Sequence, residues 1–123
     1  MSCSGKDRCD TLAAFLEAGE IPGEFDPGTY ADKWADGRPV DGTAADCLGW
    51  STIIPAFRTA GLRLTDEGEL AWGDLRCLEA AAAFLEITLE QAEATFDSLD
   101  VPSGTCGRQI VARRIRELVK EIE

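Results

Sequence analysis

Apolar residues recur at helical spacing along most of this chain. The spacing predicts helices over about residues 10–19, 27–36, 44–60, 72–86, 88–99 and 107–122. The segment 72–86 has the widest apolar face, so we expect it to contact several neighbours. The pattern therefore predicts an all-α fold, a compact bundle of five or six helices around a central helix at about 72–86.

Residues 62–72 are the one passage that resembles a strand pair. Leu62 and Leu64 alternate with polar residues before an Asp-Glu-Gly turn, and Leu70 and Trp72 alternate after it. Two strands alone are marginally stable unless they pack on helices. The segment is therefore either one short β-hairpin or an extended linker.

Proline interrupts the third predicted helix. Pro55 lies inside the segment 44–60 and removes one backbone hydrogen bond of a continuous helix. We therefore expect a kink there, or two helices with Ser51 capping the second.

Two pairs of residues have the spacing of capping boxes, in which a side chain and a backbone amide three residues apart bond reciprocally. The pairs are Thr43 with Asp46 and Thr88 with Gln91. Each pair predicts that a helix begins directly after its threonine.

Length and composition indicate one domain. The chain has 123 residues, 45% of them hydrophobic, which is enough for one core. We expect residues 1–9, which are polar, to be a flexible N-terminal segment and residues 10–123 to be a single helical domain. No apolar run reaches the roughly 20 residues of a membrane-spanning helix. The first ten residues lack the apolar stretch of a signal peptide, so we expect a cytoplasmic location.

The residue types needed for common catalytic and metal sites are missing from the sequence. There is no histidine, and the five cysteines are widely spaced without a Cys-x-x-Cys pair. Asp46 and Asp74 come nearest to an acid in an apolar context, but each lies in the first turn of a predicted helix, where a carboxylate is stabilised. We therefore expect no metal, no cofactor and no enzyme activity. A small enzyme that uses carboxylates alone remains an alternative.

Charge is unevenly distributed along the chain. The formal net charge is −11, which disfavours unaided binding to nucleic acids or anionic membranes. Residues 1–102 carry 20 acidic and 7 basic side chains, whereas residues 103–123 carry 3 acidic and 5 basic ones. The last predicted helix is therefore amphipathic and mildly basic.

The densest acidic surface is predicted near the end of the central helix. Glu86 closes that helix, and Glu90, Glu93 and Asp97 follow at helical spacing on the next one. We interpret these four residues as a binding surface for a partner protein with a basic surface. In size and charge the chain is similar to acidic inhibitors that phages and mobile elements encode, which occupy the nucleic-acid groove of host defence complexes. The leading hypothesis is a small, non-enzymatic protein-binding domain that acts as an inhibitor or regulator.

Two other arrangements are open at this level. Helices near 27–36 and 44–60 followed by a hairpin at 62–72 have the order of a winged helix-turn-helix DNA-binding domain, although Arg58 is the only basic residue of the second helix. The apolar stripe through Val111 and Ile115 could also form a dimer seam along the last helix, although it spans only about two heptads. Packing of this helix on its own domain is favoured.

Overall fold

The fold is mixed α/β, with short strands gathered beside a group of helices. The computed structural model describes residues 5–19, 21–26, 31–96, 101 and 104–122. Within these ranges the helices are α1 (Gly5–Ala18), α2 (Cys47–Ser51), α3 (Pro55–Thr59), α4 (Cys77–Leu85), α5 (Leu89–Phe96) and α6 (Thr105–Ile122). The strands are β1 (Glu24–Phe25), β2 (Trp34–Ala35), β3 (Arg38–Pro39), β4 (Ala44–Ala45), β5 (Arg63–Leu64), β6 (Leu70–Trp72) and β7 (Leu75–Arg76). The predicted all-α bundle is therefore wrong.

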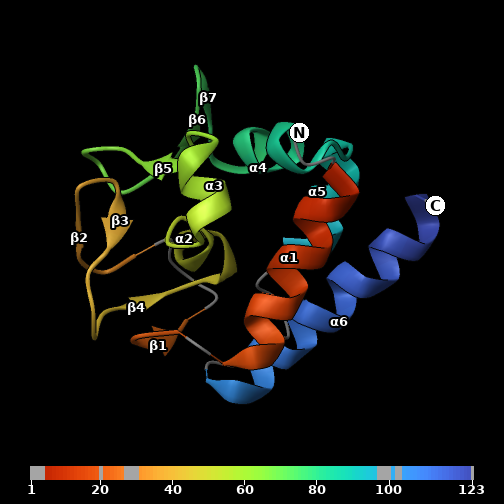
Figure 1. Ribbon diagram of the computed structural model, residues 1–123, viewed down its shortest axis with the longest axis horizontal. Coiled ribbons are helices and arrows are strands. Elements are labelled where there is room, and N and C mark those ends of the chain that lie inside the picture. The colour runs from red at the N-terminus through yellow and green to blue at the C-terminus, as the bar shows by residue number, and fades with distance from the viewer. Residues whose placement is uncertain (1–4, 20, 27–30, 97–100, 102–103, 123) are drawn as a thin grey trace.

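Three small sheets lie on one side of the molecule, together with α2 and α3, and α1, α5 and α6 lie on the other (Figure 1). The parallel strands β1 and β4 form one sheet, the antiparallel strands β2 and β3 the second, and β5, β6 and β7 the third. A backbone hydrogen bond from the Leu64 amide to the Gly37 carbonyl, 2.7 Å long, links the second sheet to the third.

The predicted helix 27–36 is replaced, in its described part, by the β2–β3 hairpin. Trp34 pairs with Pro39, and the turn between the strands is Asp36-Gly37. Both turn residues have positive φ, +55° and +78°, as a two-residue type I′ turn requires. An Asp-Gly pair favours this turn, so local turn chemistry outweighs the helical spacing of Tyr30 and Trp34. Tyr30 itself lies outside the described residues.

The hairpin expected near 62–72 is present and is longer than predicted. Strands β5 and β6 are antiparallel, with Leu64 opposite Leu70. A second turn at Gly73-Asp74 then adds β7, because Gly73 adopts a φ of +61° that other residues avoid. Residues 72–76 are thus strand and turn, and the predicted central helix 72–86 begins only at Cys77.

The predicted helix 44–60 is divided by Pro55, which becomes the first residue of α3. The expected break is confirmed, but Ser51 does not cap the second helix, since its hydroxyl donates to the Leu48 carbonyl. The N-cap of α3 is Ile54, which makes no side-chain capping bond.

The two predicted capping boxes have opposite outcomes. At Thr88 and Gln91 both reciprocal bonds are present, 3.0 Å and 2.9 Å long, so this box is confirmed. At Thr43 the box is wrong, because the Thr43 hydroxyl accepts the Lys33 amide. Asp46 is instead the N-cap of α2, and its carboxylate accepts the Gly49 amide at 2.7 Å.

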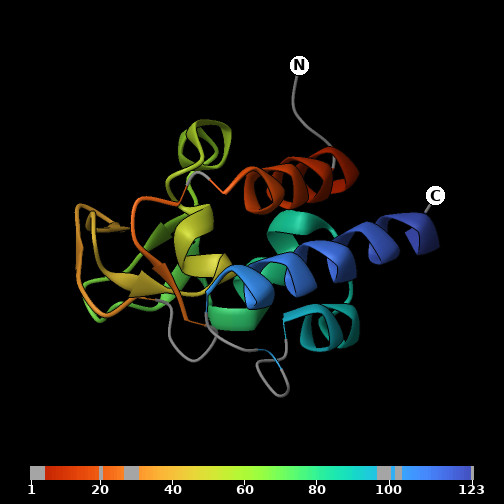
Figure 2. The same cartoon turned by 90° about the horizontal axis from the view of Figure 1, so that it is seen from below.

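Helices α1 and α6 pack along one another, as both cartoon views show (Figures 1 and 2). Val111 and Ile115 of α6 are buried within the chain, so the stripe considered as a dimer seam is an internal contact. Helix α1 begins at Gly5, and residues 5–9 of the segment expected to be flexible are helical. Cys9 on this first turn and a half is fully buried.

Trp50 connects α2 to β1. Its side chain is fully buried on α2, and its indole Nε1 donates to the Glu24 carbonyl of β1 at 2.8 Å. A Cβ atom at Gly23 would lie 2.7 Å from the Trp50 ring, so only glycine allows the chain before β1 to pass this close. The tryptophan thus fixes the position of β1, which carries part of the site described below.

Replacing Trp50 tests this role. Trp50→Phe removes the bond to Glu24 and leaves a void in the core, so the free energy of unfolding should fall by about 2–4 kcal/mol. Trp34→Phe is the matched control, because Trp34 is only half-buried and a loss of about 1 kcal/mol or less is expected. Urea denaturation followed by circular dichroism measures both. If both variants lose the same free energy of unfolding, Trp50 is not the residue that holds β1 against α2.

Candidate functional site

The acidic residues singled out from the sequence lie around the junction of α4 and α5. Glu86 is the C-cap of α4, is exposed and has a left-handed backbone with φ of +57°. Glu90 and Glu93 are exposed on α5, one turn apart. Asp97 lies outside the described residues. Of the three described carboxylates, Glu90 also lines a groove.

The groove lies between α5 and α6 and has a volume of about 290 Å³. Its described lining comprises Glu90, Gln91, Ala94, Thr95, Arg114, Glu117, Leu118 and Glu121. Three of these residues are acidic and exposed, while Leu118 is buried and forms an apolar floor. Two of the three acids, Glu117 and Glu121, come from the helix that the sequence indicated to be basic.

Two of the five basic residues of α6, Arg108 and Arg116, contact α1. Arg116 binds Asp10 at 3.3 Å and Glu17 at 2.8 Å, and its hydrogen bond lowers the pKa of the Glu17 carboxyl. Arg108 donates from Nη1 to the Leu16 carbonyl at the end of α1. The flank of α6 that faces α5 is therefore left mainly acidic. The net charge of the helix conceals this difference between its two flanks. The i, i+3, i+4, i+7 spacing of residues 114, 117, 118 and 121 could have indicated it.

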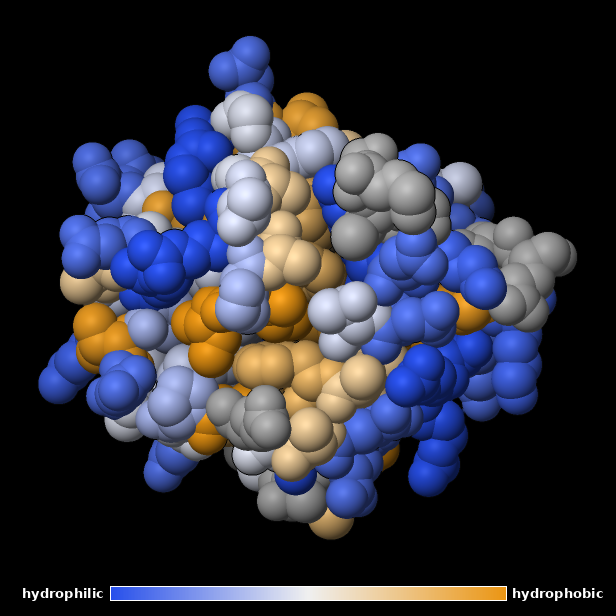
Figure 3. All heavy atoms as spheres, viewed as in Figure 1, coloured by the Kyte–Doolittle hydropathy of each residue, from blue (hydrophilic) through white to orange (hydrophobic). Residues whose placement is uncertain are grey.

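Figure 3 shows how hydrophilic and hydrophobic side chains are distributed over one face of the molecule. Hydrophilic side chains cover most of the side where α1 and α6 lie, whereas apolar side chains reach the surface at the centre of this face. An acidic groove with an apolar floor can bind a cationic side chain together with its aliphatic stem, because lysine and arginine present both.

A second pair of acids comes together through the parallel strands. Asp26 directly follows β1 and Asp46 directly follows β4, and the register Phe25 to Ala45 places the two aspartates at the same edge. Burial, with a smaller contribution from the charge of Asp26, raises the pKa of Asp46 to about 7 against the lowering effect of the Gly49 and Leu48 amides. The sequence indicated that a helix start accounts for this carboxylate. The structure corrects this expectation, because desolvation outweighs the capping bonds.

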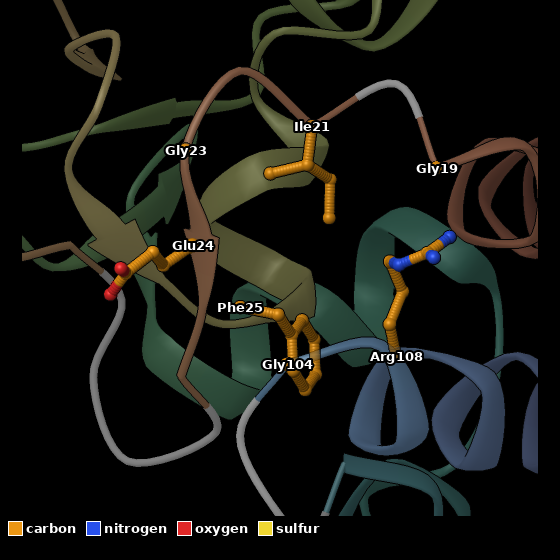
Figure 4. A pocket seen from close by; sticks show the side chains of 7 residues that line it. All are labelled: Gly19, Ile21, Gly23, Glu24, Phe25, Gly104 and Arg108. Carbon is orange, nitrogen blue, oxygen red and sulfur yellow. The ribbon is translucent and has the colours of Figure 1, made fainter.

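A larger pocket, of about 490 Å³, lies where the end of α1, the strand β1 and the start of α6 meet (Figure 4). Its described lining is Gly19, Ile21, Gly23, Glu24, Phe25, Gly104 and Arg108. The side chains of Ile21, Phe25 and Arg108 converge on this space, whereas the Glu24 carboxylate points away from it (Figure 4). The sequence offered no signal for this pocket, since its residues come from three separate segments.

No family model, curated protein or solved structure matches the chain. Across the described ranges, no cluster of three or more cysteine, aspartate or glutamate side chains is arranged to hold a metal ion. No helix among the described residues has the length and apolar character needed to span a membrane. The chemistry of the groove, the pocket and the aspartate pair is therefore the basis for assigning a function.

The raised pKa of Asp46 predicts a pH-dependent stability. Its ordinary value is 3.8 and its folded value is about 7, so the folded state holds a proton that the unfolded chain loses first. Stability should therefore fall as pH rises from about 4 to 7 and become flat above that range. Asp46→Asn, which keeps a capping side chain, should become progressively more stable than the parent across this window, by up to about 1.4 kcal/mol per pH unit.

Urea denaturation at several pH values measures this difference. Glu67→Gln is the matched control, because Glu67 is exposed, and its stability relative to the parent should not change with pH. A constant difference between Asp46→Asn and the parent from pH 4 to pH 8 would show that Asp46 is not a buried acid in the folded protein.

Proposed function

We propose that this protein is a small acidic protein-binding domain that acts without catalysis and receives a basic segment of its partner in the α5–α6 groove. The observation that carries the proposal is the joint lining of this groove by acids from two helices. Glu90 comes from α5, and Glu117 and Glu121 come from α6. These carboxylates are far apart in sequence. They add to the negative charge of one groove because α5 and α6 pack together.

The surroundings of the groove support a cationic occupant. Arg114 is the one basic side chain among the described residues that line it. Glu86, at the end of α4, and Glu93, on α5, add exposed carboxylates. Together with the net charge of −11, these carboxylates attract a basic surface through long-range electrostatics. They then form ion pairs with it at the edge of the groove.

Apolar contacts complement this charge. Leu89, at the start of α5, is 44% exposed, and Leu118 forms the floor of the groove. An amphipathic helical partner segment with basic and apolar residues at helical spacing would satisfy both features, since a helix laid in a groove uses anchors at i, i+3 or i+4, and i+7.

Proteins that handle nucleic acids present basic surfaces of this kind. An acidic domain that covers such a surface excludes the nucleic acid, so we infer that this protein acts as an inhibitor or regulator of such a partner, in the cytoplasm. The resemblance in size and charge to acidic inhibitors of phage origin agrees with this role.

The alternatives have less support. A winged helix-turn-helix needs a helix near 27–36, where Trp34 and Ala35 instead belong to β2, and a recognition helix longer than the five residues of α3. An enzyme that uses carboxylates alone would have Asp26 and Asp46 as its acid–base pair. The groove favours binding over both.

A binding assay with a defined peptide tests the proposal. The probe is a synthetic amphipathic peptide that is rich in lysine, arginine and leucine, with its affinity measured by fluorescence anisotropy. The triple variant Glu90→Gln, Glu117→Gln, Glu121→Gln should bind roughly tenfold more weakly, since each rim pair contributes about 0.2–1 kcal/mol. Raising the ionic strength from about 10 mM to about 150 mM should also weaken binding, because the Debye length falls from about 30 Å to about 8 Å.

The matched control removes the same charge elsewhere. Asp41→Asn, Asp66→Asn and Glu67→Gln are exposed positions outside the groove, and combining them changes the net charge equally. If this control weakens binding as much as the groove variant, the peptide responds to overall charge and the groove proposal is wrong. Salt-independent binding would equally overturn the electrostatic basis.

A further inference from the structure

The pocket at the junction of α1, β1 and α6 differs in charge from the rest of the molecule. Its volume of about 490 Å³ is within the range of sites that bind small molecules. In a protein with a net charge of −11, Arg108 is the one charged side chain, among the described residues that line this space, that is directed into it (Figure 4). The pocket is therefore a locally positive concavity in an acidic surface.

Most hydrogen-bond donors of Arg108 are unused among the described residues. Its guanidinium carries five N–H donors, and within the part of the chain that the structure describes it makes one hydrogen bond, to the Leu16 carbonyl, and no ion pair. Arg116 on the same helix contrasts with it, since Arg116 binds two carboxylates. A half-buried arginine without a carboxylate partner favours an anion, because a charge-assisted bond recovers part of the lost hydration.

The bond to Leu16 also orients the guanidinium. Arg108 is held against the end of α1, where Gly19 turns the chain with a φ of +72°. This positive φ favours glycine, and a Cβ atom at this position would lie 3.0 Å from Arg108 Nη1 and crowd the guanidinium. The charged head is thereby fixed at one wall of the pocket before any ligand arrives, which lowers the entropic cost of binding.

The opposite walls are apolar. Phe25 is buried on β1 with its ring beside Gly104, and Ile21 points into the space from the segment before β1 (Figure 4). A backbone bond from the Gly104 amide to the Phe25 carbonyl, 2.9 Å long, holds the start of α6 against β1. A ligand that fits this lining has a negative head for Arg108 and an apolar body for Phe25 and Ile21.

We propose that this pocket binds a small organic carboxylate that carries an apolar or aromatic group, with Arg108 as the carboxylate-binding residue. The proposal is independent of the α5–α6 groove, which lies on another flank of α6 and shares no lining residue with the pocket.

Titration with phenylacetate, followed by the amide signals of ¹⁵N-labelled protein, tests the proposal. Saturable shifts should concentrate at Gly19, Gly23 and Gly104, whose amides lie around the pocket and whose signals lie apart from most others. The neutral analogue 2-phenylethanol should produce much smaller shifts. Arg108→Gln should weaken phenylacetate binding about tenfold or more, as expected for loss of a charge-assisted hydrogen bond.

A second pocket variant and a control variant outside the pocket complete the test. Ile21→Glu places a competing carboxylate in the pocket while Arg108 stays in place, and it should also abolish binding. Arg113→Gln, an exposed arginine of the same helix, should bind phenylacetate like the parent. Equal affinity for 2-phenylethanol, or an unchanged affinity of both pocket variants, would overturn the proposal. If inorganic phosphate shifts the same glycines as strongly as phenylacetate, the pocket is a general anion site and the apolar half of the proposal is wrong.

Discussion

The packing of α6 against α1 is the constraint on which the other features depend. Ile115 is fully buried on α6, and Arg108 and Arg116 bind α1 at two levels, one at the Leu16 carbonyl and one at Asp10 and Glu17. Apolar burial brings the helices together without specifying their rotation, because it is not directional. The contacts of Arg108 and Arg116, about two turns apart on α6, do specify the rotation of the helix about its axis. Once α6 is fixed in this rotation, its acidic flank faces α5 and the start of the helix forms one wall of the Arg108 pocket.

Helical segments with strong local signals could be predicted from the sequence. The Thr88–Gln91 capping box and the break at Pro55 are encoded within a few residues, and both are present. The sheets are a different case. Trp34 fits a short helical pattern with Tyr30, but the Asp36-Gly37 turn reverses the chain after Trp34 and pairs it with Pro39. Over so few residues, turn chemistry decides between helix and strand, and apolar spacing does not.

The candidate sites could be predicted only where they are local in sequence. Glu86, Glu90 and Glu93 lie within eight residues, and the sequence identified all three as an acidic surface. The spacing of Glu117 and Glu121 indicates that they share one flank of α6, but the placement of that flank against α5 depends on helix packing, which no local pattern encodes. The pairing of Asp26 with Asp46 likewise depends on the register of two parallel strands that are 20 residues apart. Burial at that edge then reverses the pKa shift that a helix N-cap alone would produce.

Three arginines, Arg8, Arg108 and Arg116, connect α1 to its neighbouring helices. The Arg8 guanidinium lies 4.1 Å from the centre of the Phe84 ring, a cation–π contact, and donates to the Phe84 carbonyl at 2.8 Å. Arg116 neutralises two carboxylates of α1, and Arg108 binds a carbonyl at its C-terminal end, where the helix dipole is negative. Arginine suits these positions because its planar fork makes several directed bonds at once. Each such contact stabilises the packing of α1 against α4 or α6. The acids Glu90, Glu117 and Glu121 are exposed at the α5–α6 groove, where Arg114 is the one basic side chain among the described lining residues. In this chain, the same arrangement that stabilises the fold also produces the negative surface with which we propose it binds its partner.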